Sequence, residues 1–186
     1  PFGHVLLRVA LAVSFLASAS FNSFLGPEIP LTWLPLGFLL KPALFLCGTF
    51  LLIGLYTEVI SIIGLFILLL ASFVYKDYMM TYFNYFGEFV ALILFGSRIF
   101  SLDRIIFNTK SWFEKLKAWE IPIIRLTYGI SVLYPAISIK ILHPIIIIEI
   151  AKKYDLMQFH WLFPQDPLMI SLLTGLAQIV VGLCII

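Results

Sequence analysis

Charged residues are scarce in this sequence, and their scarcity excludes two broad classes of protein. Lys, Arg, Asp and Glu together make up 12% of the 186 residues, whereas a soluble domain carries about 25%. The net charge is only +2, and no run of Lys and Arg resembles the phosphate-binding surface of a nucleic-acid-binding protein. We therefore expect neither a soluble domain nor a nucleic-acid partner.

Cysteine and histidine are also rare, which argues against redox-active thiols and resident metals. Cys47 and Cys184 each stand alone in an apolar run, so the proximal pair that thiol–disulfide chemistry needs is missing. His4, His143 and His160 are too scattered for a closed zinc site and do not fall at matching depth for a bis-histidine haem. Walker loops, dinucleotide-binding glycine patterns and nucleophile elbows are missing too. The sequence predicts no metal or haem site.

Long apolar runs are what the sequence has in abundance. Hydrophobic residues make up 62% of it, and its mean hydropathy is +1.07. A helix needs about 20 mainly apolar residues to cross a bilayer, and continuous runs without strict alternation favour helices over the strands of a membrane barrel. The sequence therefore predicts an all-α, polytopic transmembrane helix bundle. Its expected spans, about six in number, are His4–Leu25, Phe38–Tyr56, Glu58–Tyr75, Phe83–Phe100, Ile121–Leu142 and Leu168–Ile186.

The spans divide the chain into three parts. We expect a four-helix transmembrane unit over residues 1–104, a cytoplasmic interfacial amphipathic helix over 105–120, and a second, incomplete transmembrane unit over 121–186. The second unit would contain an outer re-entrant or interfacial segment at 143–167. A weak internal repeat favours two units. Its aligned pairs are Arg8 with Arg125, Ser14 with Ser131, Leu16 with Leu133, Ala19 with Ala136, Leu25 with Leu142, and Gly54-Leu55 with Gly182-Leu183.

The charges of the loops predict the orientation of the chain. Seven of the 12 Lys and Arg residues collect on the side of the N-terminus. Because cytoplasmic loops carry the excess of positive charge, we expect a multi-pass protein of the cell membrane with a cytoplasmic N-terminus. We also expect both ends to be trimmed from a longer chain of about eight spans, and no cleavable signal peptide.

One acidic residue, Glu88, lies inside an apolar span. Insertion scales put the cost of such a group at roughly 2.5–3.5 kcal/mol, so it usually faces protein, a partner charge or water. Asn84 shares its helical face, and Gly87 with Ala91 has the small-xxx-small spacing of close helix packing. We expect Glu88 to be buried against protein and name it the candidate catalytic residue, a proton acceptor. The alternative is that it only caps the helix or pairs with Asn84 and a lysine.

Polar side chains in two other spans are further candidates for ligand binding. Asn22 ends a stripe of small residues in the first span, for which helix packing is the alternative role. In the fifth span, Pro135 frees a mid-helix carbonyl that neighbouring polar groups must satisfy. Lys140 either snorkels to the headgroups or supplies a cation to a ligand. With Asn84, the ligand-binding candidates are Asn22, Tyr134, Lys140 and His143.

A second set of charged residues lies at the other end of the fourth span from Glu88. Arg98 and Asp103 follow the fourth span, on the side that also holds Arg8 and Arg125. Charged groups at membrane depth usually pair with one another. We therefore expect these four residues to form an interhelical clamp rather than a catalytic site.

The exit of the fourth span reads Gly96-x-Arg98-x-x-Ser101-Leu102-Asp103, while Arg8 opens the first span and Gly54-Leu55 ends the second. In these features residues 7–104 resemble the DoxX/DoxD-like family of small four-helix membrane proteins. The lysine expected near Leu25 is missing, and the second unit has Lys140 at the matching place. Some relatives are subunits of thiosulfate:quinone oxidoreductase. The resemblance therefore implies a prokaryotic membrane redox subunit that contacts quinone and other subunits.

Three functions stay open at this point. The first is a quinone-contacting subunit of a membrane oxidoreductase, in which Asn22, Glu88 and Lys140 would line an outer-leaflet pocket. The second is a structural or assembly subunit without a ligand of its own. The third is a small-solute transporter, favoured by the repeat and by the break at Pro135. Membrane lipid is a partner in all three.

Overall fold

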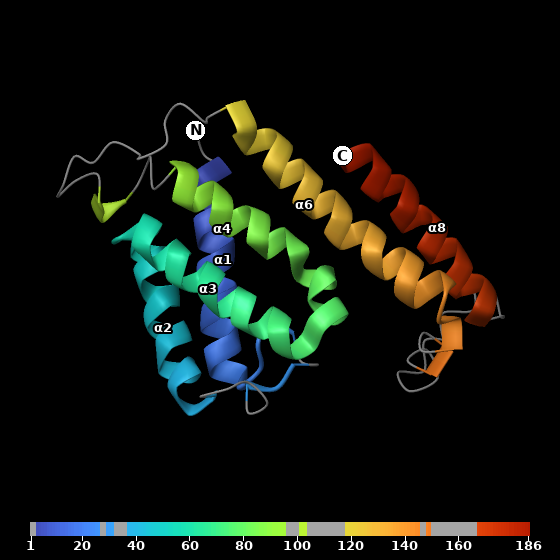
Figure 1. Ribbon diagram of the computed structural model, residues 1–186, viewed down its shortest axis with the longest axis horizontal. Coiled ribbons are helices and arrows are strands. Elements are labelled where there is room, and N and C mark those ends of the chain that lie inside the picture. Colours follow the sequence, from blue (N-terminus) through green and yellow to red (C-terminus); the bar gives the residue numbers. More distant parts are fainter. Residues whose placement is uncertain are drawn as a thin grey trace, which may run out of the picture.

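Helices make up most of the residues that this computed structural model describes, which are 3–26, 29–31, 37–95, 101–103, 118–145, 148–149 and 167–186. The elements follow one another along the chain as shown in Figure 1. Their bounds are α1 Gly3–Phe21, α2 Gly37–Ile53, α3 Thr57–Tyr75, the 3-10 helix η2 Lys76–Tyr82, α4 Phe83–Phe95, α6 Glu120–Pro135, the π-helical η4 Ala136–Ile141 and α8 Pro167–Ile185. These ranges hold no strand, only a single bridge between Ser23 and Pro30. The predicted all-α fold is confirmed for the described residues.

Four helical stretches are long and apolar enough to cross a membrane: Gly3–Phe21, Thr57–Leu94, Glu120–Ile141 and Leu168–Ile185. The second of these folds back at η2, so that α3 and α4 lie side by side (Figure 1). Large apolar side chains cover the outside, with Phe73 81% and Leu6 69% exposed. Such a surface is unfavourable in water and suited to hydrocarbon. The chain is a membrane-embedded helical protein.

The first helix ends before the predicted Leu25, and the backbone gives the reason. Asn22 has a φ of 53°, the left-handed conformation that ends many helices and that Asn tolerates better than most residues. The N–H of Ser23 donates to the carbonyl of Ser18 at 3.2 Å, the bond that closes such a helix end. The chain then turns back, and Phe24 enters the core.

A glycine makes the hairpin between α2 and α3. Gly54 has a φ of +75°, and a Cβ at this position would lie 2.5 Å from Nη1 of Arg8. The N–H of Leu55 donates to the carbonyl of Phe50 at 3.0 Å. Both the conformation and the space therefore require glycine. The second and third predicted spans therefore join in a tight hairpin.

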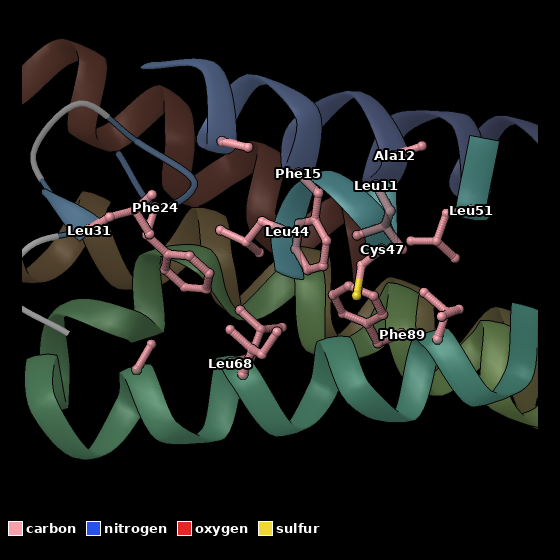
Figure 2. Packing of buried hydrophobic residues seen from close by; sticks show 14 of the residues in the cluster. Leu11, Ala12, Phe15, Phe24, Leu31, Leu44, Cys47, Leu51, Leu68 and Phe89 are labelled. Carbon is pink, nitrogen blue, oxygen red and sulfur yellow. The ribbon is translucent and has the colours of Figure 1, made fainter. Parts of the chain in front are cut away.

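A core of buried apolar side chains joins the helices from α1 to α4 (Figure 2). Phe15 of α1 and Phe89 of α4 pack with their ring centroids 5.3 Å apart. Gly64 of α3 lets the Phe89 ring approach, because a Cβ there would overlap the ring. Leu44 of α2 and Leu68 of α3 complete the centre, both fully buried.

α6 packs against α4, and α8 packs against α6 (Figure 1). The α4–α6 contact is close at Gly87, where a Cβ would overlap Oγ1 of Thr127. Nε2 of His4 lies 2.8 Å from Oε1 of Glu120, which ties the start of α1 to the start of α6. The close packing predicted for Gly87 and Ala91 is confirmed, because both residues are buried.

One packing contact recurs in the helix pairs α1–α2 and α6–α8. A Cβ on Gly48 of α2 would lie 2.9 Å from Cγ of Leu16, and a Cβ on Gly182 of α8 would lie 2.7 Å from Cγ of Leu133. In both pairs a backbone carbonyl oxygen also lies close to the glycine. It is that of Ala12 in the first pair and that of Gly129 in the second. Leu16 and Leu133 are equivalent positions of the predicted repeat, but the two glycines are not, because the repeat aligns Gly182 with Gly54 and not with Gly48. The shared packing contact therefore matches the repeat in only one residue of each pair.

The fifth span changes its winding after Pro135, where η4 replaces the regular α-helix. Oγ of Ser138 donates to the carbonyl of Tyr134 at 2.7 Å, and Oγ of Ser171 in α8 donates to the carbonyl of Lys140 at 3.0 Å. Hydroxyl groups thus bond to two carbonyls beside and within the π-helical turn. The carbonyl that Pro135 itself frees is that of Ser131, one turn earlier, and it is not one of these two acceptors. The expectation that polar neighbours satisfy it stays a prediction.

Several predictions concern residues outside the described ranges. The clamp residue Arg98 is one of them. Of the interfacial helix at 105–120, only residues 118–120 are described, and Trp119 is exposed there. Of the segment 143–167, only residues 143–145, 148–149 and 167 are described.

Candidate functional site

The candidate site is centred on Glu88, in the second turn of α4. Its side chain is 2% exposed, so neither lipid nor bulk water surrounds the carboxyl group. The glycine before it brings α4 against Thr127, and this close approach places the carboxyl group at the face of α6. The expected burial of Glu88 against protein is confirmed.

Both helices donate hydrogen bonds to the same oxygen of Glu88. The hydroxyl of Tyr128 in α6 donates to Oε1. Nδ2 of Asn84, one turn earlier in α4, donates to Oε1 at 3.2 Å. The contact with Asn84 agrees with one part of the alternative role, in which Glu88 pairs with Asn84 and a lysine, but no lysine is among the hydrogen-bond partners that the described residues give Glu88. Both donors are neutral groups.

The second carboxyl oxygen, Oε2 of Glu88, is buried and has no hydrogen-bond partner among the residues that the structure describes. A buried polar atom without a partner costs about 1–3 kcal/mol, and such atoms are rare in folded proteins. Oε1 holds the carboxyl group through two hydrogen bonds, while Oε2 makes none to the described residues. Chemically, Oε2 can accept a hydrogen bond from a hydroxyl group, or donate one to a carbonyl when it carries a proton.

A tyrosine of α4 near the carboxyl group contacts a serine of α1. Oη of Tyr85 lies 3.2 Å from Oγ of Ser14, and Tyr85 is within electrostatic range of Glu88. The site thus takes residues from three helices. We call this set the Glu88 cluster: Ser14 of α1, Asn84, Tyr85 and Glu88 of α4, and Tyr128 of α6.

The structure does not bring Asn22 to this cluster. Its side chain is exposed, and its backbone ends α1. The carbonyl of Asn22 accepts a hydrogen bond from the N–H of Leu31 at 3.0 Å. Asn22 therefore shapes the turn after α1 and is not among the partners of Glu88.

Lys140, Tyr134 and His143 lie further along the fifth span. Lys140 is 12 residues beyond Tyr128, a distance of about 18 Å along a helix. Nδ1 of His143 lies 2.7 Å from the carbonyl oxygen of Ser138, and the Tyr134 carbonyl also bonds to that serine. Tyr134 lies near the end of α6, Lys140 lies in η4, and His143 follows η4. The pocket expected from Asn22, Glu88 and Lys140 is not assembled.

Asp103 occupies a separate position at the other end of the bundle, where it caps α3. Oδ1 accepts the N–H of Tyr56 at 2.6 Å, and Oδ2 accepts the N–H of Thr57 at 2.9 Å. The N–H of Asp103 itself donates to the carbonyl of Gly54 at 3.1 Å. A carboxylate at a helix start satisfies backbone donors and complements the helix dipole. The residues of the Ser-Leu-Asp motif therefore anchor the end of the first unit to the α2–α3 hairpin.

Of the arginines expected around Asp103, Arg8 and Arg125 are among the described residues, and they make different contacts. Arg8 is buried beside Gly54 and Ser101, and the charge of Asp103 acts on it. Nε of Arg125 instead donates to the carbonyl of Ile185 in α8 at 2.6 Å. Arg8 and Asp103 thus lie in one charged group, whereas Arg125 connects α6 to α8.

Sequence reasoning missed Tyr85 and Tyr128 as parts of the site. A buried tyrosine hydroxyl usually finds a hydrogen-bond partner, so Tyr128 in the middle of an apolar span was a usable signal. Its partner, however, depends on which helix packs against α4. Among the described residues, no group of three or more His, Cys, Asp or Glu side chains is placed to hold a metal ion.

Comparison with protein-family models, with curated proteins and with solved structures finds no significant match for this chain.

Proposed function

We propose that this chain is an integral membrane subunit of a prokaryotic redox system, and that the Glu88 cluster binds the polar head of a quinone. The observation that carries the proposal is the buried oxygen Oε2 of Glu88, which has no partner among the described residues. The redox context comes from the resemblance of residues 7–104 to DoxX/DoxD-like proteins. A quinone supplies two-electron redox chemistry when it is bound.

The cluster can supply hydrogen bonds to the oxygen atoms of a quinone head group. Tyr128 and Asn84 hold Oε1, so the carboxyl group cannot rotate without losing two hydrogen bonds. Oε2 accepts a hydrogen bond from a hydroxyl in one protonation state and donates one to a carbonyl in the other. Glu88 is therefore suited to both the reduced and the oxidised form of such a head group, and can hold a proton at Oε2.

Binding of decylubiquinone tests this proposal, with the purified protein in lipid nanodiscs and both redox forms titrated. In Glu88→Gln the amide oxygen can still accept from Tyr128 and Asn84, but the amide nitrogen can only donate. We expect the variant to retain the oxidised form and to bind the reduced form about tenfold more weakly, the equivalent of one lost hydrogen bond.

Asp77→Asn is the matched control, because Asp77 is an exposed acid outside the cluster, in η2. It should bind both forms as the wild type does. The proposal is wrong if the wild type binds neither form, or if Glu88→Gln binds both with unchanged affinity.

A second candidate function, a structural subunit without a ligand, is favoured by the hydrogen bond from Tyr128 to Glu88, since it links α6 to α4. On this hypothesis the whole role of the carboxyl group is to fasten the two helices. Glu88→Ala would then lower stability, and decylubiquinone would bind to no variant.

A further inference from the structure

A groove between α1 and α2 lies apart from the Glu88 cluster. Its volume is about 590 Å³, within the range of about 300–1,000 Å³ that small-molecule sites occupy. It shares no residue with the cluster. Its lining residues are Ala19 and Ser20 of α1 with Lys41, Pro42, Phe45 and Leu46 of α2.

Most of this lining is apolar and faces outward. Phe45 is 53% and Leu46 54% exposed, beside the buried Ala19. Pro42 lies inside α2 and brings no N–H donor of its own. The wall of the groove is therefore suited to a hydrocarbon chain lying along the protein.

One cation stands at the end of this apolar wall. Lys41 is exposed and forms no ion pair with any residue of the described ranges. The hydroxyl of Ser20, the other polar side chain in the lining, already donates to the carbonyl of Leu16 at 2.8 Å. Lys41 is thus the group of the lining that can bind an anion. It lies in the second turn of α2, near a helix end, where lysines reach the level of the lipid headgroups.

We propose that this groove binds an anionic phospholipid, with an acyl chain along Phe45 and Leu46 and the headgroup phosphate paired with Lys41. An apolar wall beside one cation that has no ion pair among the described residues complements a ligand that is apolar along its length and negative at one end. Basic residues between membrane helices bind anionic headgroups by the same attraction.

Native mass spectrometry of the detergent-purified protein tests this proposal. Phosphatidylglycerol and phosphatidylcholine with identical acyl chains are titrated against wild type, Lys41→Gln and Lys76→Gln. Lys76 is an exposed lysine outside the groove, at the end of α3. We expect wild type and Lys76→Gln to prefer phosphatidylglycerol, and Lys41→Gln to bind it about fivefold more weakly.

A second variant tests the apolar wall without touching the charge. Leu46→Trp fills the groove from an exposed position and should reduce the binding of both lipids. The proposal is overturned if both lipids bind equally to the wild type, or if Lys76→Gln weakens binding as much as Lys41→Gln does. Displacement of the lipid by decylubiquinone with equal effect in wild type and Lys41→Gln would also overturn it, because the occupant would then be a neutral chain.

Discussion

At the scale of single residues, the smallest side chain in α4 determines how the site is assembled. Gly87 leaves room for Thr127, and this contact sets Glu88 beside Tyr128. A larger residue would push α4 and α6 apart and separate the carboxyl group from the hydroxyl group. The chemistry of the site therefore depends on a residue that takes no part in it.

Gly87→Ala should destabilise the protein by about 1–3 kcal/mol, the usual cost of overpacking. Its Cβ would overlap Oγ1 of Thr127, so one of the two helices must shift. Unfolding in detergent, followed by circular dichroism against denaturant, measures the loss. Gly3→Ala is the control, because a Cβ there meets nothing within 4 Å; equal stability of the two variants would contradict this packing.

At the scale of helices and turns, the start of α3 depends on a residue distant in sequence. Tyr56 and Thr57 donate their N–H groups to the carboxylate of Asp103, and the N-cap residue itself supplies no side-chain cap. Asp103, which follows α4 in the sequence, therefore holds the hairpin that precedes α3.

Asp103→Ala should lower stability by about 0.5–2 kcal/mol, the range for a lost N-cap. It should also speed hydrogen exchange of the amides of Tyr56 and Thr57, which lose their acceptor. Exchange measured by mass spectrometry on peptides covering 54–60 checks both sites. Asp77→Ala, which changes an exposed acid in η2, should leave this exchange unchanged, and unaltered exchange in Asp103→Ala would rule out the cap.

The helices were predictable and the site only in part, for physical reasons. Long apolar runs predicted the α-helices of the described residues, because hydrophobicity is a local signal. Only four stretches of these residues are long and apolar enough to cross a membrane, so the expected number of about six spans stays a prediction. The pairing of Asn84 with Glu88 followed from four-residue spacing. Tyr128 did not, because its partner depends on which helices pack together. Asn22 was a candidate because of its amide group, whereas the role that the structure shows for it is a backbone conformation that ends a helix.

At the scale of the whole molecule, the helices end at two opposite sides of the protein. His4 and Glu120 pair at one end, near the hairpin of Gly54 and the cap of Asp103. Lys76 lies at the other end of α3. The excess of Lys and Arg on the side of the N-terminus leads us to propose that the His4 end faces the cytoplasm.

Cysteine labelling in cells tests this orientation. In a background without Cys47 and Cys184, a membrane-impermeant thiol reagent should label Lys76→Cys in intact cells and Tyr56→Cys only after permeabilisation. Both positions are exposed at opposite ends of α3. The reverse pattern would contradict the orientation, and labelling of both from one side would contradict the crossing of α3.

The most direct test of the proposed role of Glu88 is an infrared difference spectrum between the oxidised and reduced states of the decylubiquinone-loaded protein. If Oε2 of Glu88 bonds to the head group, the carboxyl C=O band of the wild type shifts between the two states. That feature should disappear in Glu88→Gln and persist in Asp77→Asn. A wild-type spectrum without a carboxyl feature, or one whose carboxyl feature survives in Glu88→Gln, would contradict a quinone site at Glu88.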